Sequence, residues 1–193
     1  TVRVNITGNG FFGENSGTAN IQGFLNASNT TSIAVPTINL NSGQLITKQD
    51  TTINSGSILN FNSGNISASE YATLRVNGTL RASSKALIRF TNLFIHDGGL
   101  LDHPSGTSSL INLTLLGNLT IDTFGRIDVS SNGYGTSAGP GRATDSSSAG
   151  YGNDGVNTGF TFGRAYGSVL SPSDYGSGAG QGPGGGIVML NVT

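Results

Sequence analysis

The stretch that decides the fold runs from residue 93 to residue 129 and reads LFIHDGGLLDHPSGTSSLINLTLLGNLTIDTFGRIDV. Three short apolar segments follow one another in it, at residues 93–95, 110–116 and 119–121. The first and third resume after glycine corners, at Gly98-Gly99 and at Gly125. None of them shows the 3.6-residue periodicity of a helix. Repeated strand, corner and strand predicts a coil of stacked β-rungs, a parallel β-helix or a closely related β-solenoid.

The same corner recurs upstream of this stretch. An apolar residue precedes a short polar segment that contains Gly, and another apolar residue follows it. The variants are Leu40-Asn-Ser-Gly43-Gln-Leu45, Ile53-Asn-Ser-Gly56-Ser-Ile58, Phe61-Asn-Ser-Gly64-Asn-Ile66, Val76-Asn-Gly78-Thr-Leu80, Ile95-His-Asp-Gly98-Gly-Leu100 and Ile121-Asp-Thr-Phe-Gly125-Arg-Ile127. Asn and Gly accept left-handed backbone angles, so the chain can bend sharply while the flanking apolar residues enter one core.

The spacing between these corners is uneven, whereas a strict solenoid has a fixed period. We interpret the unevenness as turns with more than one corner, joined by loops of different lengths. The competing interpretation is antiparallel hairpins, because an Asn-Gly turn between strands is also a hairpin signal. A β-sandwich or jelly roll is therefore the alternative fold.

Composition indicates one all-β domain over residues 1–193 and excludes several partners. Residues 1–131 would form the rungs, 132–186 a Gly-rich loop region and 187–193 a closing strand. The net charge of −1 offers no field for nucleic acid or an acidic membrane. There is no Cys for a disulfide or a thiolate zinc site. We expect no membrane insertion, since no apolar run approaches about 18 residues, and the first residues do not form a signal peptide.

More than half of the 31 glycines lie in residues 132–186. Such a composition is typical of a flexible linker. Aromatic residues recur in it, however, and this favours ordered loops packed on the β-core. The tyrosines are candidates for stacking on sugar rings, with packing on the β-core as the alternative: Tyr134, Tyr151, Tyr166 and Tyr175.

The last strand resembles the first. Val188-Met-Leu190-Asn191-Val192-Thr193 matches Val2-Arg-Val4-Asn5-Ile6-Thr7 in its pattern of aliphatic residues, Asn and Thr. A solenoid leaves unpaired strands at both ends. The sequence therefore predicts that the C-terminal strand of one copy pairs with, or continues into, the N-terminal strand of the next, giving a head-to-tail filament. The residues expected in this assembly are Val2, Val4, Ile6, Val188, Leu190 and Val192.

Two short clusters of ionisable residues have possible chemistry. His96, Asp97, Asp102 and His103 flank one corner, and could bind a metal or act as acid and base. The alternative is that they are exposed polar corner residues. Asp122 and Asp128 flank the next corner and resemble the paired carboxylates of glycoside hydrolases.

That second pair also has a plain structural interpretation, because both aspartates alternate with aliphatic residues and would face solvent. A polysaccharide-cleaving enzyme would need Asp97, Asp122 and Asp128 to gather at one point. We predict that they do not, and that the protein is not an enzyme.

Oxygen-bearing side chains in the Gly-rich region suggest a possible calcium site: Asp145, Asn153, Asp154, Asn157 and Asp174. No EF-hand pattern accompanies them, and we predict no cofactor beyond this possible Ca²⁺. The Gly182–Gly186 run is no phosphate loop, because no Lys follows it and the next element is a strand.

Eight Asn-x-Ser/Thr sequons make N-glycosylation a further prediction, with Asn77 and Asn118 the favoured sites. The alternative is that these amides stack in ladders between rungs. The sequons begin at Asn5, Asn26, Asn29, Asn65, Asn77, Asn112, Asn118 and Asn191.

From about Leu74 to Val192 the chain resembles Gly-rich β-helix modules of large secreted and cell-surface proteins. The phrases LRVNGTLRAS, NLTIDTFGRIDVSSNGYG, AYGSVLSPSDYGSGAG and GPGGGIVMLNV carry the resemblance. The Asn-Ser-Gly part is similar to repeats of filamentous-haemagglutinin-type adhesins. The resemblance implies an extracellular location and a role in adhesion or surface fibres, and it supplies no catalytic residues.

Together these observations predict a structural module of an extracellular filament or adhesin, with further copies of itself as the partner and glycans as a second candidate partner. The alternatives are a carbohydrate-binding module and, third, a polysaccharide-cleaving β-helix enzyme.

Overall fold

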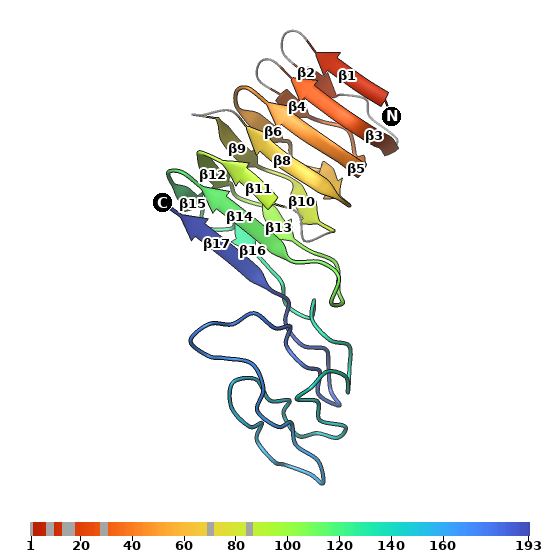
Figure 1. Ribbon diagram of the computed structural model, residues 1–193, viewed down its shortest axis with the longest axis vertical. Coiled ribbons are helices and arrows are strands. Elements are labelled where there is room, and N and C mark those ends of the chain that lie inside the picture. Colours follow the sequence, from red (N-terminus) through yellow and green to blue (C-terminus); the bar gives the residue numbers. More distant parts are fainter. Residues whose placement is uncertain (1, 7–9, 13–17, 28–30, 69–71, 84–86) are drawn as a thin grey trace. The chain divides into compact units, whose positions relative to one another are not determined.

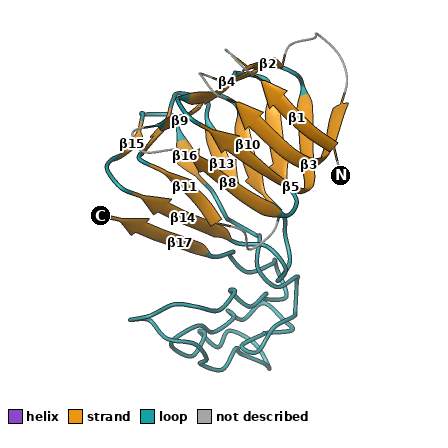
Figure 2. Ribbon diagram, turned by 45° about the horizontal axis from the view of Figure 1, so that its top comes forward, coloured by secondary structure: helices purple, strands orange, loops and turns teal. Residues whose placement is uncertain are grey.

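The computed structural model describes the 193-residue chain except residues 1, 7–9, 13–17, 28–30, 69–71 and 84–86. Its regular structure is all β, and the described residues contain no helix that could cross a membrane (Figure 2). The strands are β1 (Val2–Ile6), β2 (Gly10–Phe12), β3 (Thr18–Ala27), β4 (Thr31–Ile33), β5 (Thr37–Thr47), β6 (Thr51–Ile53), β7 (Ile58–Phe61), β8 (Gly64–Ala68), β9 (Thr73–Val76), β10 (Thr79–Ala82), β11 (Leu87–Phe90), β12 (Asn92–Ile95), β13 (Leu100–Asp102), β14 (Ile111–Leu115), β15 (Leu119–Ile121), β16 (Arg126–Ile127) and β17 (Val188–Val192).

The strands wind as a parallel β-solenoid, which confirms the predicted fold. Each complete turn places one strand in each of three columns, as β6, β7 and β8 do, and the next turn stacks β9, β10 and β11 on them (Figure 1). The ladders between neighbouring strands are parallel, from β1 with β3 to β12 with β15. The alternative of a sandwich or jelly roll is therefore wrong, because either needs antiparallel neighbours.

Two kinds of bend explain the uneven spacing of the corner phrases. β5 is long enough to span two columns, and its first half pairs with β7 while its second half pairs with β8. The phrases that follow Leu40 and Phe61 lie at this gentle bend between columns. The other four lie at a sharper corner between the first and second strands of a turn. In the middle of the second column the turns are 21 residues long, since Asn60 lies beside Asn39 and Asp102 beside Arg81 after 21 residues each. The step from Asn20 to Asn39 in the same column is 19 residues.

The sharp corners need glycine for two different reasons. Gly56 and Gly98 have φ of +77° and +80°, in the left-handed region. Gly125 instead needs its bare Cα, because a Cβ there would lie 2.9 Å from the carbonyl oxygen of His96 in the turn before. The prediction that Gly makes the bends is thus correct at these sharp corners, whereas no Asn has a positive φ among the described residues.

The core lies inside the coil, because successive side chains of a strand point to opposite faces. Ile33, Ile53, Val76 and Ile95 stack in one interior column and are fully buried. Removing a side chain of this size from water contributes about 1.5–3 kcal/mol. Because aliphatic side chains stack on aliphatic side chains of the next turn, one short sequence pattern repeated in each turn is enough to build the core.

A second compact unit comprises residues 103–110 and 129–188. Both segments leave the coil at the gentle bend between the second and third columns, from β13 to β14 and from β16 to β17. Backbone hydrogen bonds between loops order this unit: the Gly133 N–H donates to the Gly184 carbonyl (2.8 Å) and the Gly184 N–H to the Tyr134 carbonyl (2.9 Å). That these loops pack on the β-core stays a prediction.

Candidate assembly surface

The first and last strands of the coil lie at opposite ends of the same column. β1 pairs only with β3, and β17 pairs with β14, among the described strands. Between them the column runs through β3, β5, β8, β11 and β14 (Figure 1). The coil therefore begins and ends with the same kind of strand.

The two end strands also occupy the same register. Val4 pairs with Leu25, and this register position continues as a row along the column. At the other end the Thr193 N–H donates to the Leu115 carbonyl (3.0 Å), and in this coil that bond places Leu190 beside Leu113. The row is Val4, Leu25, Leu45, Ile66, Ile88, Leu113 and Leu190. The likeness of the two terminal phrases thus coincides with equivalence in the fold.

No described strand pairs with the outer edge of β17. In this coil a residue that faces outward bonds to the turn before, as the Asn62 N–H does with Leu40 (3.0 Å). A residue that faces inward bonds to the turn after, as the Phe61 carbonyl does with Ser83 (2.8 Å). By this alternation Leu190 and Val192 direct their N–H and C=O groups to the open edge. Such an edge is a template for strand addition.

Interior residues of the last turn are partly uncovered. Leu190, Val192 and Ile121 are 44%, 47% and 43% exposed. Their neighbours in the preceding turn, Leu113 and Ile95, are at most 1% exposed. The last turn therefore displays apolar side chains at positions that are buried in the earlier turns whose side chains the structure describes.

An amide ladder runs along the outer face of the second column. The Asn39 Nδ2 donates to Asn20 Oδ1 (2.8 Å), and the Asn60 Nδ2 donates to Asn39 Oδ1 (2.8 Å). The next two positions are Arg81 and Asp102, joined by three charge-assisted hydrogen bonds of 2.6, 3.0 and 3.1 Å. Hydrogen bonding to this carboxylate raises the pKa of Arg81, although burial opposes it.

Sequence reasoning considered amide ladders only for the sequon asparagines, and this ladder uses others. The signal was available as Asn39 and Asn60, which stand 21 residues apart in equivalent strands. It was missed because the period itself was not recognised.

The sequon asparagines are spread over the coil. Asn118 and Asn191 are exposed, and Asn77 and Asn112 are half-buried. Asn77 Oδ1 is buried without a partner among the described residues. The other side chains lie outside what the structure describes, namely Asn5, Asn26, Asn29 and Asn65, as do those of the assembly residues Val2, Val4 and Ile6. Glycosylation stays a prediction.

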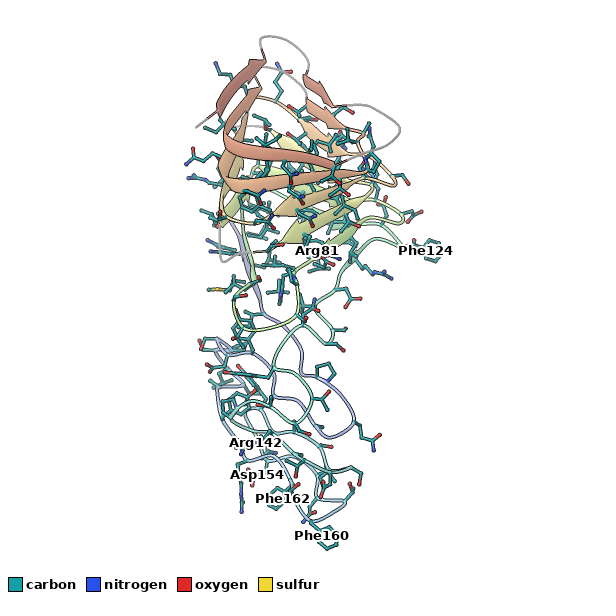
Figure 3. All side chains as sticks on the ribbon, turned by 90° about the vertical axis from the view of Figure 1, so that its right-hand side faces the viewer. Arg81, Phe124, Arg142, Asp154, Phe160 and Phe162 are labelled. Carbon is teal, nitrogen blue, oxygen red and sulfur yellow. The ribbon has the colours of Figure 1, made fainter. Side chains whose placement is uncertain are left out.

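His96 and Asp97 belong to one corner and are used there for structure. His96 Nδ1 lies 2.9 Å from Asp122 Oδ2, and its ring stacks on Phe94 at 6.0 Å between centroids. The Phe124 N–H donates to Asp97 Oδ1 (3.0 Å), while the Phe124 side chain projects from the corner (Figure 3). These contacts tie successive turns together.

Asp102 and His103 do not join that corner, and the alternative that they are exposed is wrong. Both are buried: Asp102 beneath Arg81, and His103 inside the loop unit. His103 Nδ1 bonds to the Pro104 carbonyl (2.7 Å), and its Nε2 accepts the Ile187 N–H (3.2 Å). Asp102 belongs to the coil and His103 to the loop unit, so the two side chains have different partners although they are adjacent in sequence.

The possible catalytic aspartates have separate partners. Asp122 pairs with His96, and Asp128 lies 3.9 Å from Arg126 Nε. Among the described residues no three His, Cys, Asp or Glu side chains gather as a metal site would require.

The carboxylate of Asp145 organises a loop. It accepts the backbone N–H groups of Ser147 (2.8 Å), Phe160 (2.6 Å) and Thr161 (2.7 Å). These bonds, that of Ser147 foremost, hold the pKa of Asp145 well below its usual range. Asp154 similarly accepts the Ala165 N–H (2.6 Å). The remaining calcium candidates are Asn153 and Asn157, which accept neighbouring backbone N–H groups, and Asp174, whose own N–H donates to Tyr151.

The four tyrosines of the loop unit pack in two edge-on pairs. Tyr175 is buried with Leu110 and Ile187, and burial raises the pKa of its hydroxyl. Tyr134 packs edge-on against Tyr175 at 6.4 Å. Tyr166 packs edge-on against Tyr151 at 5.0 Å and donates its hydroxyl to the Tyr175 carbonyl. The ring of Tyr175 therefore has no open face for a sugar.

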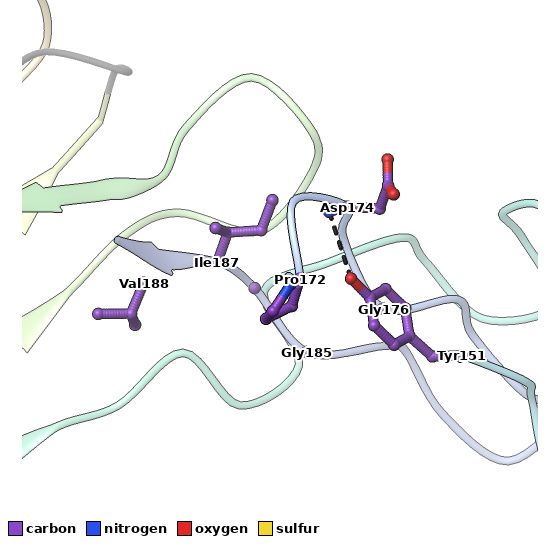
Figure 4. Close-up of a pocket in the computed structure, with 8 residues that line it drawn as sticks. Tyr151, Pro172, Asp174, Gly176, Gly185, Ile187 and Val188 are labelled. Carbon is purple, nitrogen blue, oxygen red and sulfur yellow. Dashed lines mark hydrogen bonds between the residues drawn. The ribbon is translucent and has the colours of Figure 1, made fainter. Parts of the chain in front are cut away.

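One pocket of about 270 Å³ lies within the loop unit (Figure 4). Tyr151 and Pro172 line one part of it and Ile187 and Val188 another, with glycine backbone between. The Tyr151 hydroxyl accepts the Asp174 N–H (3.4 Å) at its margin. The pocket is mainly apolar, with one carboxylate at its rim.

Comparisons with known proteins gave no relative, since no family model, no curated protein and no solved structure matches this chain.

Proposed function

We propose that this protein is a structural module of an extracellular filament or surface adhesin, and that copies join head to tail through β17 and β1. One observation carries the proposal: the two strands match in sequence and occupy the same register at opposite ends of one column. A copy added to the β17 edge would continue the same row of aliphatic residues and the same parallel ladder.

The environment of the reactive groups supports an architectural role. Two pairs of ionisable side chains bond across neighbouring turns. Arg81 bonds to Asp102, and His96 bonds to Asp122. Contacts of this kind stiffen a stack of turns. They leave these side chains engaged in holding the coil together instead of facing a shared reaction centre.

The proposal is tested by blocking the open edge. Val192→Pro removes an N–H that points to the next copy and leaves the bond from Thr193 to Leu115 in place. We expect the wild-type chain to form concentration-dependent oligomers in light scattering and filaments in negative-stain images, and Val192→Pro to stay monomeric. Val192→Thr is the matched control, because it retains the N–H and the side-chain shape, and it should still assemble. A monodisperse wild-type monomer at high concentration would rule the proposal out.

A carbohydrate-binding role is the second candidate, and the pocket beside Tyr151 favours it. An aromatic ring next to a carboxylate suits a sugar, whose C–H face stacks on the ring while its hydroxyls donate to the carboxylate. Glycan-array binding that is lost in Tyr151→Ala and retained in Tyr151→Phe would support this role. Binding that is equal in wild type and Tyr151→Ala would remove it.

We also infer that the chain works outside the cell and carries glycans on some sequons. The exposure of Asn118 and Asn191 is compatible with attachment. Peptide mass mapping of the native protein tests this, and a mass increase at Asn118 that a glycosidase removes is the expected result.

A further inference from the structure

The outer amide ladder has two chemically different ends. At its first position Asn20 Oδ1 accepts a hydrogen bond from Asn39. Because the amide is planar, the Asn20 NH₂ group lies on the other side, directed away from the ladder and toward the open end. Asn20 is exposed. This end of the ladder therefore presents a hydrogen-bond donor.

Asp128 stands at the opposite end. Ile127 pairs with Leu101, and the Asp128 N–H donates to the Leu101 carbonyl (3.0 Å), so Asp128 follows Asp102 in the same row. A carboxylate only accepts hydrogen bonds, and its two oxygens can accept several. The side chain of Asp128 is 41% exposed. This end of the ladder presents an acceptor.

The winding of the coil brings these two ends together. In a head-to-tail junction β1 of the next copy would pair with β17, and the following turn would stack β3 of the next copy on β16. The residue of β3 that meets Asp128 in the row is Asn20, since the row runs Asn20, Asn39, Asn60, Arg81, Asp102, Asp128.

We propose that Asn20 of one copy donates a hydrogen bond to the Asp128 carboxylate of the preceding copy, and that this contact helps to set the polarity of the filament. The inference rests on the proposed head-to-tail assembly and names a determinant of its specificity. Two copies that met through their last turns would bring Asp128 but no Asn20 to the interface, so this hydrogen bond could not form. Two copies that met through their first turns would bring Asn20 without Asp128.

Asn20→Asp is the sharpest test. The new carboxylate still accepts the bond from Asn39, but it replaces the outward NH₂ with an oxygen that faces Asp128. Two carboxylates in directly opposed positions repel, so we expect association to weaken about tenfold at low salt, measured by sedimentation velocity. Because salt screens exposed charges, the defect should shrink as ionic strength rises.

The double variant Asn20→Asp/Asp128→Asn serves as the matched control. It exchanges donor and acceptor, so the bond can form in the reverse direction, and association should return to within about threefold of wild type. Asp128→Asn alone keeps a carbonyl acceptor and should weaken association less than Asn20→Asp does. Circular dichroism and the unfolding midpoint of each variant establish that the coil is intact.

The outcomes separate this inference from the proposed function. If wild type assembles, Val192→Pro does not, and Asn20→Asp assembles like wild type at low salt, the head-to-tail filament stands and the Asn20–Asp128 contact is wrong. A double variant that is as defective as Asn20→Asp also overturns the contact. A wild-type chain that never assembles overturns both.

Discussion

At the scale of single residues, the interior of the coil holds polar groups that the aliphatic pattern hides. The hydroxyls of Thr31, Thr47 and Thr51 are buried without a partner among the described residues. Thr31 and Thr51 stack on each other in the row that continues with Leu74. A buried hydroxyl without a hydrogen bond destabilises the folded state by roughly 1–3 kcal/mol.

We therefore expect Thr51→Val, which has nearly the same shape, to stabilise the protein by about 1 kcal/mol in urea unfolding, because it removes the unpaired hydroxyl. Thr52→Val is the matched control, since Thr52 is partly exposed and should show no gain. A loss of stability in Thr51→Val would mean instead that the hydroxyl has a partner, such as an internal water.

At the scale of elements, loops in the Gly-rich unit are held by side chains that accept backbone N–H groups. Because the pKa of Asp145 is lowered on folding, the bonds to Phe160 and Thr161 contribute stability above the ordinary aspartate pKa of about 3.9, and this contribution is lost as pH falls toward the folded-state pKa. We expect the amide shifts of Phe160 and Thr161, followed by NMR, to stay constant from pH 7 to about pH 4 and to change only well below it. Asp145→Asn should abolish that transition. A midpoint near 4 in the wild type would contradict the lowered pKa.

The elements were predictable to different degrees. The strands around Ile95, Leu113 and Ile121 were predicted, because apolar runs and glycine corners alternate closely there. The strand β3 was not, because Thr18–Ala27 contains two Asn and a Gly and lacks clear alternation. It is a strand because it stacks on β5, a tertiary effect that local propensity cannot supply.

The assembly strands were predicted from their likeness alone, and their shared register could come only from the three-dimensional winding. The ladder from Asn20 to Asp128 was not predictable for the same reason: its members are far apart and unevenly spaced in sequence, and they meet only in the wound coil.

At the scale of the whole molecule, stability and assembly draw on the same interactions. Each turn is held by the row of aliphatic residues and the parallel ladder of the turn before it, so an added copy uses contacts that the coil already contains. In a one-dimensional stack, stability grows with each neighbour gained. We expect the thermal midpoint of the assembling wild type to rise with protein concentration, while that of Val192→Pro stays constant. Equal concentration dependence in both would contradict coupling through this edge.

The gentle bend between the second and third columns takes two residues, Asn62 and Ser63, where β7 meets β8, and it takes a whole folded unit where β16 meets β17. The number of residues inserted at this bend therefore does not set the strand order of the coil, because β17 still pairs with β14 after the whole loop unit. A repeating fibre with such a bend in every turn can gain or exchange decorations at regular axial intervals without redesign of its backbone. Diversity in what the surface presents could then evolve independently of the scaffold that presents it.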